Sequence, residues 1–563
     1  PEELDMSNDA QGTDAPPEEP TTQDNAETDQ VGILEPPTTI RGVVRHLGPG
    51  LIIAGSIVGS GELIATTKTG AQAGFSLLWL ILLGCIIKVF VQVELGRYTL
   101  INGKTTMQGM VEVPGPRIGK GNWLVWAWFL MFLFSLAQLG GIVGGVGQAL
   151  AISAPITDGG VEYNKHVSLL TKEKVKVKEV ELVSRLVASG DSDPVRLESL
   201  RAELSDLNTR VAEADLLLRR DLGEERYNEL GGKPPVSPDA KLWATLVTVV
   251  TIVMLVYGKY GLIQSFSTAM VGLFTFITVY NLFRLQGNPE WAVTFEDIKY
   301  GFSLALPERE GAIATALATF GIIGVGASEL VAYPYWCLEK GYAKFTGPRE
   351  MTPEWERRAR GWMRVMQWDA WASMVVYTFA TIAFFLLGAA ILGRTELDPE
   401  KNEMIRYLAV MYEPVFGSAA QMLFLFGAFA VLYSTFFVAN ASLSRVASDA
   451  VRTLGFIEPS EKNYRRMVKI LCAVLPGLCL ISFLADFAPD KVILASGVMQ
   501  SIVLPMIGSA ALFFRYRRFD ERLRPHLAWD IFLWVSAGGM LMTGVWTAWV
   551  KLSPFILSFW PGA

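Results

Sequence analysis

The sequence predicts an all-α polytopic membrane protein with about eleven transmembrane helices, and three observations lead to that prediction. Of the 563 residues, 51% are hydrophobic and only 18% are charged, which is too little charge to cover a water-soluble protein of this length. Apolar runs of about 20 residues, long enough to cross a bilayer core of ~30 Å, recur along the chain. Matching glycine-rich stretches interrupt two of these runs, so we expect a five-plus-five inverted repeat with broken helices 1 and 6.

The chain divides into a polar start, two membrane regions and a charged insertion between them. Residues 1–40 are acidic and lack aromatic side chains, which predicts a disordered N-terminal tail without the apolar core of a signal peptide. Residues 41–159 are expected to hold helices 1–3, and residues 236–563 helices 4–11. The apolar runs lie at about 47–70, 76–100, 123–152, 240–258, 261–284, 311–338, 366–393, 415–444, 466–486, 490–514 and 528–552.

Lysine and arginine residues are unevenly distributed between the connections, and this bias predicts the orientation. A cytoplasmic N-terminus puts the connections after the second, sixth, eighth and tenth runs inside, and each of them carries several basic residues. The connection between the ninth and tenth runs would then lie outside, where Asp486 and Asp490 outweigh Lys491. We therefore expect a multi-pass protein of the cell membrane with its N-terminus in the cytoplasm.

Residues 160–235 form a highly charged insertion that is too long for a loop without structure of its own. Asp193 is a candidate N-cap, with Pro194 at the first helical position of the second half. We expect a coiled-coil-like helical hairpin that projects from the extracytoplasmic face, either as a protein contact or as an addition without a role of its own. Its predicted seam consists of Val180, Val183, Val187, Leu197, Leu200, Leu204, Leu207 and Val211.

The first and sixth apolar runs share a motif of small residues followed by a glutamate. It reads Gly59-Ser60-Gly61-Glu62-Leu63-Ile64-Ala65 in the first run and Gly326-Ala327-Ser328-Glu329-Leu330-Val331-Ala332 in the sixth. Glycine and serine weaken an apolar helix, and backbone groups freed inside a membrane need partners that lipid does not supply. Such a stretch either lines a cavity or packs closely against another helix. Because the copies occupy inverted positions, we interpret them as two halves of one binding site.

Each copy places a carboxylate near the middle of its run, where a charge costs roughly 2.5–3.5 kcal/mol on insertion scales. Glu62 and Glu329 are therefore candidate metal ligands and candidates for proton coupling, although either could instead cap a helix break. The predicted substrate-binding residues are Gly59, Ser60, Gly61, Glu62, Gly326, Ala327, Ser328 and Glu329.

Short segments at the starts of three apolar runs carry a family resemblance. Gly48-Pro49-Gly50 opens the first run, Gly70-Ala71-Gln72-Ala73-Gly74-Phe75 leads into the second, and Asp369 begins the seventh. Together these segments resemble the Nramp family of divalent-metal transporters, over most of residues 42–552 apart from the insertion. The resemblance implies a leucine-transporter-like fold that moves manganese, iron and related ions, usually with protons.

The metal-binding motifs of that family are not preserved. The resemblance implies that its first motif, Asp-Pro-Gly-Asn, falls on Gly59-Ser60-Gly61-Glu62, and that its second, Met-Pro-His, falls near Gly326-Ala327-Ser328-Glu329. A methionine ligand favours softer metals, whereas carboxylate and hydroxyl oxygens suit harder ions such as Mg²⁺ or Mn²⁺. The alternative is a small organic solute such as an amino acid, because the missing side chains would enlarge the cavity.

Asp369 is a candidate gate residue on the cytoplasmic side of the predicted bundle. It is placed to pair with Arg360 or Arg364, or to serve only as a charge favoured by a helix N-terminus.

A few other polar residues interrupt the apolar runs. Lys88 and Gln92 share one helix face, and Glu94 is placed to pair with Arg97 near the membrane surface. Hydrogen bonds between helices are expected from Gln138, Gln148, Asn440 and Gln500.

These features predict a secondary transporter of a divalent metal cation that works by alternating access around the two breaks, as a symporter where protons are coupled. A transporter of a small organic solute is the alternative, and a receptor or assembly protein built around residues 160–235 is a third. No nucleotide loop or nucleophile with a base partner occurs in the sequence, so neither enzymatic activity nor a cofactor is expected. The expected partners are the cargo, membrane lipid and any protein that contacts residues 160–235, but no nucleic acid.

Overall fold

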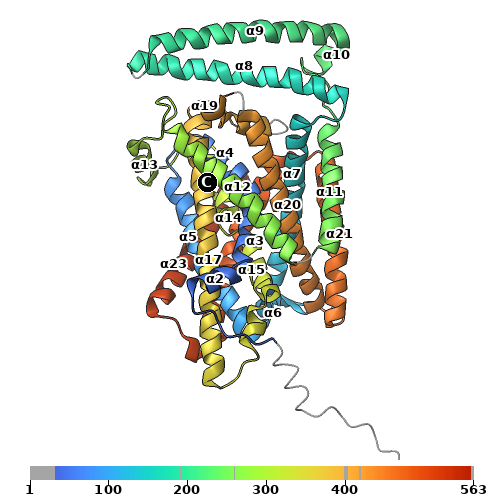
Figure 1. The fold of residues 1–563 in the computed structure, drawn as a ribbon, viewed down its shortest axis with the longest axis vertical. Coiled ribbons are helices and arrows are strands. Elements are labelled where there is room, and N and C mark those ends of the chain that lie inside the picture. Colours follow the sequence, from blue (N-terminus) through green and yellow to red (C-terminus); the bar gives the residue numbers. More distant parts are fainter. Residues whose placement is uncertain (1–31, 191, 259, 399–403, 418–419, 559–563) are drawn as a thin grey trace, which may run out of the picture.

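The computed structural model describes residues 32–558 apart from 191, 259, 399–403 and 418–419. Most of the predicted tail, residues 1–31, therefore lies outside the described residues. A bundle of long helices stands upright in Figure 1, and α8 (Asp158–Ser189) and α9 (Pro194–Leu222) lie across one end of it. We call this the hairpin end. The opposite end holds α2 (Ile40–His46), α6 (Thr106–Glu112) and α16 (Tyr342–Thr346).

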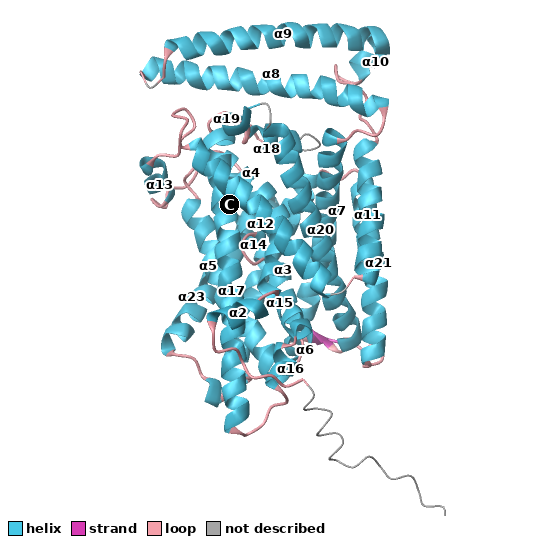
Figure 2. Cartoon of the chain, viewed as in Figure 1, coloured by secondary structure: helices cyan, strands magenta, loops and turns pink. Residues whose placement is uncertain are grey.

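Helices make up nearly all of the regular structure (Figure 2). The first repeat consists of α3 (Pro49–Ile57), the π-helical segment η1 (Val58–Thr66), α4 (Thr67–Ala73), α5 (Leu78–Asn102), α7 (Trp123–Ser153), α11 (Asp239–Tyr257) and α12 (Tyr260–Leu285). The second consists of α14 (Ala312–Ile322), α15 (Ala327–Lys340), α17 (Pro353–Leu387), η2 (Gly388–Gly393), α20 (Ala420–Thr453), α21 (Glu461–Leu484) and α22 (Pro489–Arg517), and α23 (Leu527–Ser558) follows it.

Short elements connect these helices. They are β1 (Arg117–Ile118) paired antiparallel with β2 (Gly121–Asn122), α10 (Glu224–Glu229), α13 (Phe295–Gly301), α18 (Met404–Val410), α19 (Glu413–Phe416) and the 3-10 turn η5 (Glu521–Leu523). Within the described chain, ten helices are long and apolar enough to cross a membrane, and a bent pair raises the number to eleven. The predicted set of about eleven membrane helices is confirmed.

Helix 1 is bent where the sequence places its glycine-rich motif. The segments Pro49–Ile57 and Gly61–Ala73 meet at an angle of 43°. At the bend, the Thr435 hydroxyl of α20 accepts from the Gly59 amide (2.9 Å) and donates to the Gly55 carbonyl (3.2 Å). These two backbone groups would otherwise bond to each other in an α-helix, and a side chain inserted into that ladder is a recognised cause of a kink.

Helix 6 is fully interrupted. Helix α14 ends at Ile322, Ile323 is extended (φ −77°, ψ 160°), and Gly324 adopts the left-handed conformation (φ 60°) that glycine tolerates best. Helix α15 starts after Gly326, whose backbone is again extended. The four residues 323–326 therefore leave the C-terminus of one half-helix and the N-terminus of the next without a helical continuation.

The insertion forms a helical hairpin. Val183, Leu197 and Leu200 are buried between its two helices, in the seam that the sequence predicts. The Asp193 carboxylate caps α9 by accepting from the Val195 amide (2.9 Å). The expectation that the hairpin projects from the bundle is wrong, because it lies flat across the end (Figure 1).

Polar contacts fix the hairpin in this position. The Asp239 carboxylate, at the start of α11, accepts from the Ile156 amide (2.8 Å) and the Thr157 hydroxyl (2.7 Å) just before α8. Farther along α8, Ser168 accepts from the Arg406 guanidinium of α18 (2.8 Å). Each of these hydrogen bonds has one charged partner, and Val175 and Leu182 of α8 add apolar packing against the bundle core. Sequence periodicity does not show which bundle residues these side chains meet, so it could not show this docking.

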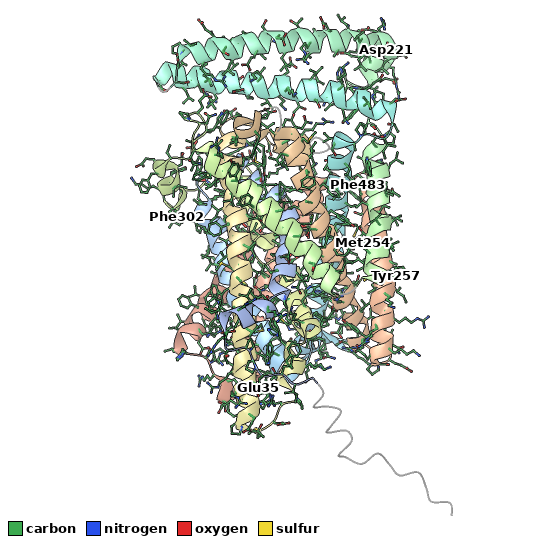
Figure 3. All side chains as sticks on the ribbon, viewed as in Figure 1. Glu35, Asp221, Met254, Tyr257, Phe302 and Phe483 are labelled. Atoms are coloured by element: carbon green, nitrogen blue, oxygen red, sulfur yellow. The ribbon has the colours of Figure 1, made fainter. Side chains whose placement is uncertain are left out.

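The described end of the predicted tail is not free. The Leu34 amide donates to the Phe345 carbonyl (3.0 Å), and the Trp362 indole donates to the Leu34 carbonyl (2.9 Å). Glu35 forms an ion pair with Arg357 (2.8 Å), at the end of the molecule far from Asp221 in α9 (Figure 3). The prediction of disorder up to residue 40 is therefore wrong for residues 32–40.

Candidate functional site

A small pocket lies where helices α3, α7, α15, α20 and α22 converge, next to both interruptions. Its polar lining is made of hydroxyl, amide and carboxylate groups, and leucine and alanine side chains complete the wall. The lining residues are Ser56, Ser135, Gln138, Leu139, Ser328, Glu329, Ala332, Thr435, Ala439, Ser442, Leu443 and Gln500. Oxygen donors of these kinds are the ligands that hard cations prefer.

Glu329 is the one carboxylate in this pocket. It lies in the first turn of α15, where the positive end of the helix dipole favours an anion. Ser56 of α3 donates to its carboxylate (3.1 Å), so the group is held between the two interrupted helices. A Cβ at Gly326 would lie 2.5 Å from the Glu329 carboxylate and 2.9 Å from the Gln500 amide oxygen. Glycine at this position therefore allows both groups to approach the backbone of the break.

An amide and hydroxyl network forms the other wall of the pocket. Gln500 donates to the Gln138 side-chain oxygen (3.1 Å), which also accepts from Ser496 (2.6 Å). The Ser328 amide donates to Gln500 (3.3 Å), and its hydroxyl lies 3.0 Å from that of Ser135. The predicted bridging role of Gln138 and Gln500 is confirmed, and the bridge places both residues in the pocket wall.

Glu62 lies outside this pocket. Its carboxylate is fully buried and accepts from the Thr381 hydroxyl of α17 (3.1 Å) and from the Gly324 amide in the break of helix 6 (3.3 Å). Its second oxygen, Oε2, has no hydrogen-bond partner among the described residues. Neither a hydrogen bond nor a shared pocket joins Glu62 to Glu329 in the described chain, so the two predicted metal ligands are held apart.

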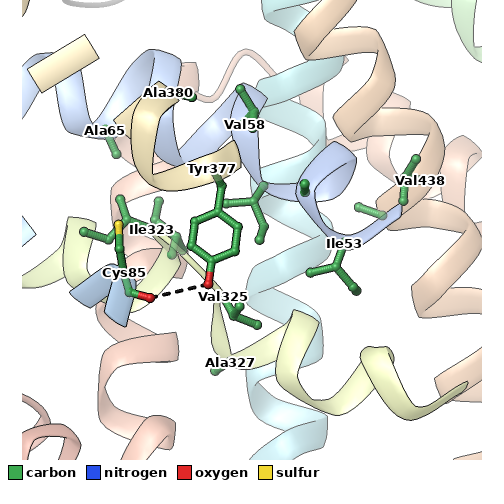
Figure 4. Close-up of a cluster of buried hydrophobic side chains, with 14 of the residues drawn as sticks. Ile53, Val58, Ala65, Cys85, Ile323, Val325, Ala327, Tyr377, Ala380 and Val438 are labelled. Atoms are coloured by element: carbon green, nitrogen blue, oxygen red, sulfur yellow. Dashed lines mark hydrogen bonds between the residues drawn. The ribbon is translucent and has the colours of Figure 1, made fainter. Parts of the chain in front are cut away.

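Two of the remaining predicted site residues, Gly59 and Gly61, pack closely against neighbouring helices. A Cβ at Gly59 would lie 2.4 Å from the Thr435 hydroxyl, and one at Gly61 would lie 2.9 Å from the Ile322 carbonyl. Ala327 is buried, and the side chain of Ser60 lies outside the described residues. Figure 4 shows the apolar cluster around both interruptions, with Ala327 among its members. Nowhere in the described chain do three His, Cys, Asp or Glu side chains gather as a metal site.

Lys88 is the site residue that sequence reasoning undervalued. This lysine of α5 is completely buried, and its ammonium donates to the carbonyls of Phe320 and of Ile323 (2.8 Å for the latter) at the break of helix 6. The charges of Glu62 and Glu329 both act on it. A single lysine in the middle of an apolar run was the available signal, because an ionisable group there is a functional candidate by default.

Asp369 of α17 joins that helix to the start of helix 1. Its carboxylate accepts from the amides of Gly48 (2.7 Å) and Gly50 (2.6 Å) at the start of helix 1, and from the Tyr333 hydroxyl of α15 (3.1 Å). The predicted pairing with Arg360 or Arg364 is wrong. Arg360 pairs with Glu356 on its own helix, and Arg364 is exposed.

Ion pairs close the site toward the hairpin end. Lys68 of α4 pairs with Asp490 at the start of α22 (3.1 Å). Asp398 accepts from Gln72 (2.7 Å) and pairs with Arg309 (3.2 Å). Both ends of helix 1 are thus tied to the second repeat.

Comparisons with known proteins agree with this architecture. The model of the Nramp family, described as natural resistance-associated macrophage protein-like, matches residues 230–550, which is more than half of the chain. A crystal structure of an Eremococcus coleocola manganese transporter, bound to an aromatic bis-isothiourea compound, is similar with a TM-score of 0.54 and 10% identity, covering 93% of this chain and 91% of that one. A mutant of the same transporter gives a TM-score of 0.52 at 9% identity, over 93% and 90% of the two chains.

A curated relative adds a local match. An uncharacterized protein of Pasteurella multocida is 34% identical over 90 residues, which is 16% of this chain and 19% of that protein. The chain therefore spans about a fifth of that relative, and the match says nothing about what this chain carries.

Proposed function

The chain belongs to the Nramp family of secondary metal-ion transporters, and we propose that its cargo is a hard divalent cation such as Mg²⁺ or Mn²⁺. The observation that carries the proposal is the pocket around Glu329, whose polar donors are all oxygen or amide groups. Neither a thioether nor an imidazole lines it. Such a donor set matches ions that prefer carboxylate, carbonyl and water ligands.

One carboxylate cannot complete the coordination of such an ion. The Glu329 carboxylate, the hydroxyls of Ser56 and Ser328 and the Gln500 amide oxygen supply a few ligands, and retained water supplies the rest. Mg²⁺ in particular keeps several of its waters when proteins bind it. The Eremococcus coleocola relative is described as a manganese transporter, and Mn²⁺ shares the preference for oxygen ligands.

The contacts at the two ends supply the alternation that transport requires. When the pocket opens toward the end opposite the hairpin, the hydrogen bonds of Asp369 to Gly48 and Gly50 break. When it opens toward the hairpin end, the ion pair of Lys68 and Asp490 breaks. Each opening frees one half of helix 1 and leaves the other half closed. Glu62 and Glu329 are the candidates for coupling this cycle to protons.

The organic-solute alternative is not favoured. That alternative assumed that the cavity is larger here, because Gly59 stands where the family motif has an aspartate side chain. At Gly59 and Gly61 that space is filled, because Thr435 and the Ile322 carbonyl lie where a Cβ would be. As a transporter the chain releases its cargo unchanged, so we propose no enzymatic role for it.

The orientation and partners belong to the same proposal. We place the protein in the cell membrane with its N-terminus in the cytoplasm, which puts the hairpin outside the cell. The exposed faces of α8 and α9 are then available to a protein partner.

Uptake into proteoliposomes tests the proposal. Purified protein is reconstituted, and uptake of Mg²⁺ and of Mn²⁺ is measured with and without a pH gradient. We expect saturable uptake. We expect Glu329→Gln to weaken cation affinity about tenfold or more, which corresponds to a loss of about 1.4 kcal/mol or more of binding free energy. The matched control is Glu458→Gln, which changes an exposed glutamate. Absence of uptake of any divalent cation by folded protein would overturn the metal assignment.

A further inference from the structure

A buried lysine lies beside this proposed cation site, at the break of helix 6, and its position needs an explanation. Lys88 has no exposed surface, and an ammonium group in the membrane interior is costly unless it is paired. Its own helix, α5, offers no acid in contact with it. Instead the ammonium reaches across to helix 6, where it donates to Phe320 and Ile323 and lies 4.6 Å from the centre of the Phe320 ring.

The carbonyls that Lys88 holds are those exposed by the break. The last carbonyls of a helix have no partner within it, and the helix dipole makes this end negative. In transporters with broken helices, such half-helix ends and unwound carbonyls coordinate small cations. Together with an aromatic face, the two carbonyls form a cage suited to an ammonium ion.

Glu62 holds the same break from the other side. Its carboxylate accepts from the Gly324 amide, one residue after the Ile323 carbonyl that Lys88 occupies. The charges of Glu62 and Glu329 both act on Lys88. The lysine and the buried carboxylate of helix 1 therefore hold the same short segment of the helix 6 backbone, which leads into the helix that carries Glu329.

We infer that Lys88 is a tethered cation that takes the place of a free monovalent ion at the break of helix 6. The inference rests on the proposed function, because it assigns Lys88 a role beside the cargo site at Glu329. Lys88 acts as a positioning residue: it holds residues 320–323 in the shape that presents α15 and Glu329 to the pocket. Transport by the unaltered protein then requires neither Na⁺ nor K⁺.

The test removes the ammonium group and supplies it again from solution. Lys88→Ala leaves a cage with two carbonyls and an aromatic face, which methylammonium fits in size and hydrogen bonding. Tetramethylammonium has the same charge but no N–H donor, so it is the matched control ion. Lys88→Met fills the space without restoring a charge, and it is the matched control variant.

Thermal unfolding in detergent measures ion binding in the cage independently of transport. We expect methylammonium to raise the unfolding midpoint of Lys88→Ala by about 3 °C or more, because an ion that binds only the folded state stabilises it. Neither tetramethylammonium with this variant nor methylammonium with the unaltered protein or Lys88→Met should do so. Recovery of folded Lys88→Ala only from methylammonium buffer supports the inference equally.

Cation uptake by the Lys88 variants is the second measurement. Lys88→Ala should lose about nine-tenths or more of cation uptake, methylammonium should restore part of it, and Lys88→Arg should retain more than Lys88→Met. Lys88→Ala or Lys88→Met with unaltered stability and uptake overturns the inference, as does uptake by the unaltered protein that depends on Na⁺ or K⁺. If no divalent cation is carried at all, the proposed function fails while the unfolding measurement still decides the role of Lys88.

Discussion

Glu62 and Glu329 occupy matching positions of the repeat but have different neighbours. Glu329 faces hydroxyl and amide groups in a pocket, whereas Glu62 is enclosed by α17 and by the backbone of helix 6. The pocket carboxylate is suited to bind the cargo. The enclosed carboxylate is suited to hold the break, and its second oxygen has no hydrogen-bond partner among the described residues.

Gly326 offers a prediction at the scale of one residue. In Gly326→Ala the new Cβ would lie 2.5 Å from the Glu329 carboxylate, which must then move. We expect loss of cation affinity, with a stability cost of about 1–3 kcal/mol from overpacking. Isothermal titration with Mn²⁺ and thermal unfolding measure the two effects.

The control for that variant is Gly272→Ala in α12. A Cβ there would meet nothing within 4 Å, and alanine favours a helix over glycine. Stability should be unchanged or slightly higher, and affinity unchanged. If Gly326→Ala binds the cation as well as the control does, Glu329 is not held against the break in the way described.

Asp520 offers a prediction about pH. It lies outside the membrane helices, between α22 and α23, and the hydrogen bond from Arg522, with help from Arg349, lowers its pKa from 3.8 to about 2. Because the folded-state pKa is depressed, the stability that Asp520 contributes is present above pH of about 4 and is lost as pH falls toward about 2.

The measurement compares unfolding midpoints of Asp520→Asn and of the unaltered protein between pH 6 and pH 3. The unaltered protein should be the more stable above pH of about 5, and the difference should shrink below about pH 4. The exposed control Glu458→Gln should show no such convergence. A difference that stays constant over the whole range would mean that Asp520 contributes through packing and not through its charge.

At the scale of elements, the two interruptions have different causes, and only one of them could be predicted in detail. Glycines at 324 and 326 in an apolar run indicate a break, and the structure has one. In helix 1 the bend depends on Thr435, a residue of another helix that inserts into the hydrogen-bond ladder. Contacts between residues so far apart in sequence leave no trace in local periodicity.

The site was predictable to a similar extent. The repeat motif led to Glu329 and Ser328, which do line the pocket, because polar groups in an apolar run are conspicuous. It gave no reason to separate Glu62 from Glu329, since Glu62 lies in a π-helical turn of helix 1 and Glu329 in an α-helix. The pairing of Asp369 was mispredicted because the sequence shows only the arginines that lie near it along the chain. The backbone amides of Gly48 and Gly50, which actually bind its carboxylate, come close only in the fold.

The start of helix 1 provides the prediction for this scale. In Asp369→Ala the amides of Gly48 and Gly50 lose a charged acceptor, worth about 1.5–3 kcal/mol for each such hydrogen bond. We expect the pocket to open more readily toward the opposite end. A cysteine introduced as Ser56→Cys should then react faster with a water-soluble maleimide added from that side.

The chain's own four cysteines are buried and serve as a low background for that labelling. Arg364→Ala is the matched control, because this arginine is exposed and was the alternative partner of Asp369. Equal labelling rates in Asp369→Ala and Arg364→Ala would exclude a gating role for Asp369.

At the scale of the whole molecule, the hairpin has a small seam of its own and also packs on the bundle. The seam is buried between α8 and α9, and the pocket is lined by bundle helices alone. Val175 and Leu182 of α8 belong to the hydrophobic core of the bundle, and polar contacts such as Lys174 with the Tyr407 hydroxyl (3.2 Å) add to this packing. Composition predicted the helices, but only the fold shows which bundle residues the hairpin meets.

Removal of the hairpin tests whether the bundle folds and transports without it. Its two ends lie together, because a Cβ at Gly160 would be 3.1 Å from the Ser237 hydroxyl, so a short glycine-serine linker can replace residues 161–236. We expect the shortened protein to fold and to retain cation uptake, since no pocket residue is removed. Its unfolding midpoint should fall by a few degrees, because the contacts to α18 are lost.

A second variant separates docking of the hairpin from its folding. Leu200→Asp buries a charge in the seam, where Leu200 is fully buried, and should unfold the hairpin while leaving the linked bundle intact. Uptake that survives both changes would assign the hairpin to contacts outside the transport cycle. Uptake lost by the folded, shortened protein alone would show that the hairpin, through its contacts at the hairpin end, takes part in opening and closing the pocket.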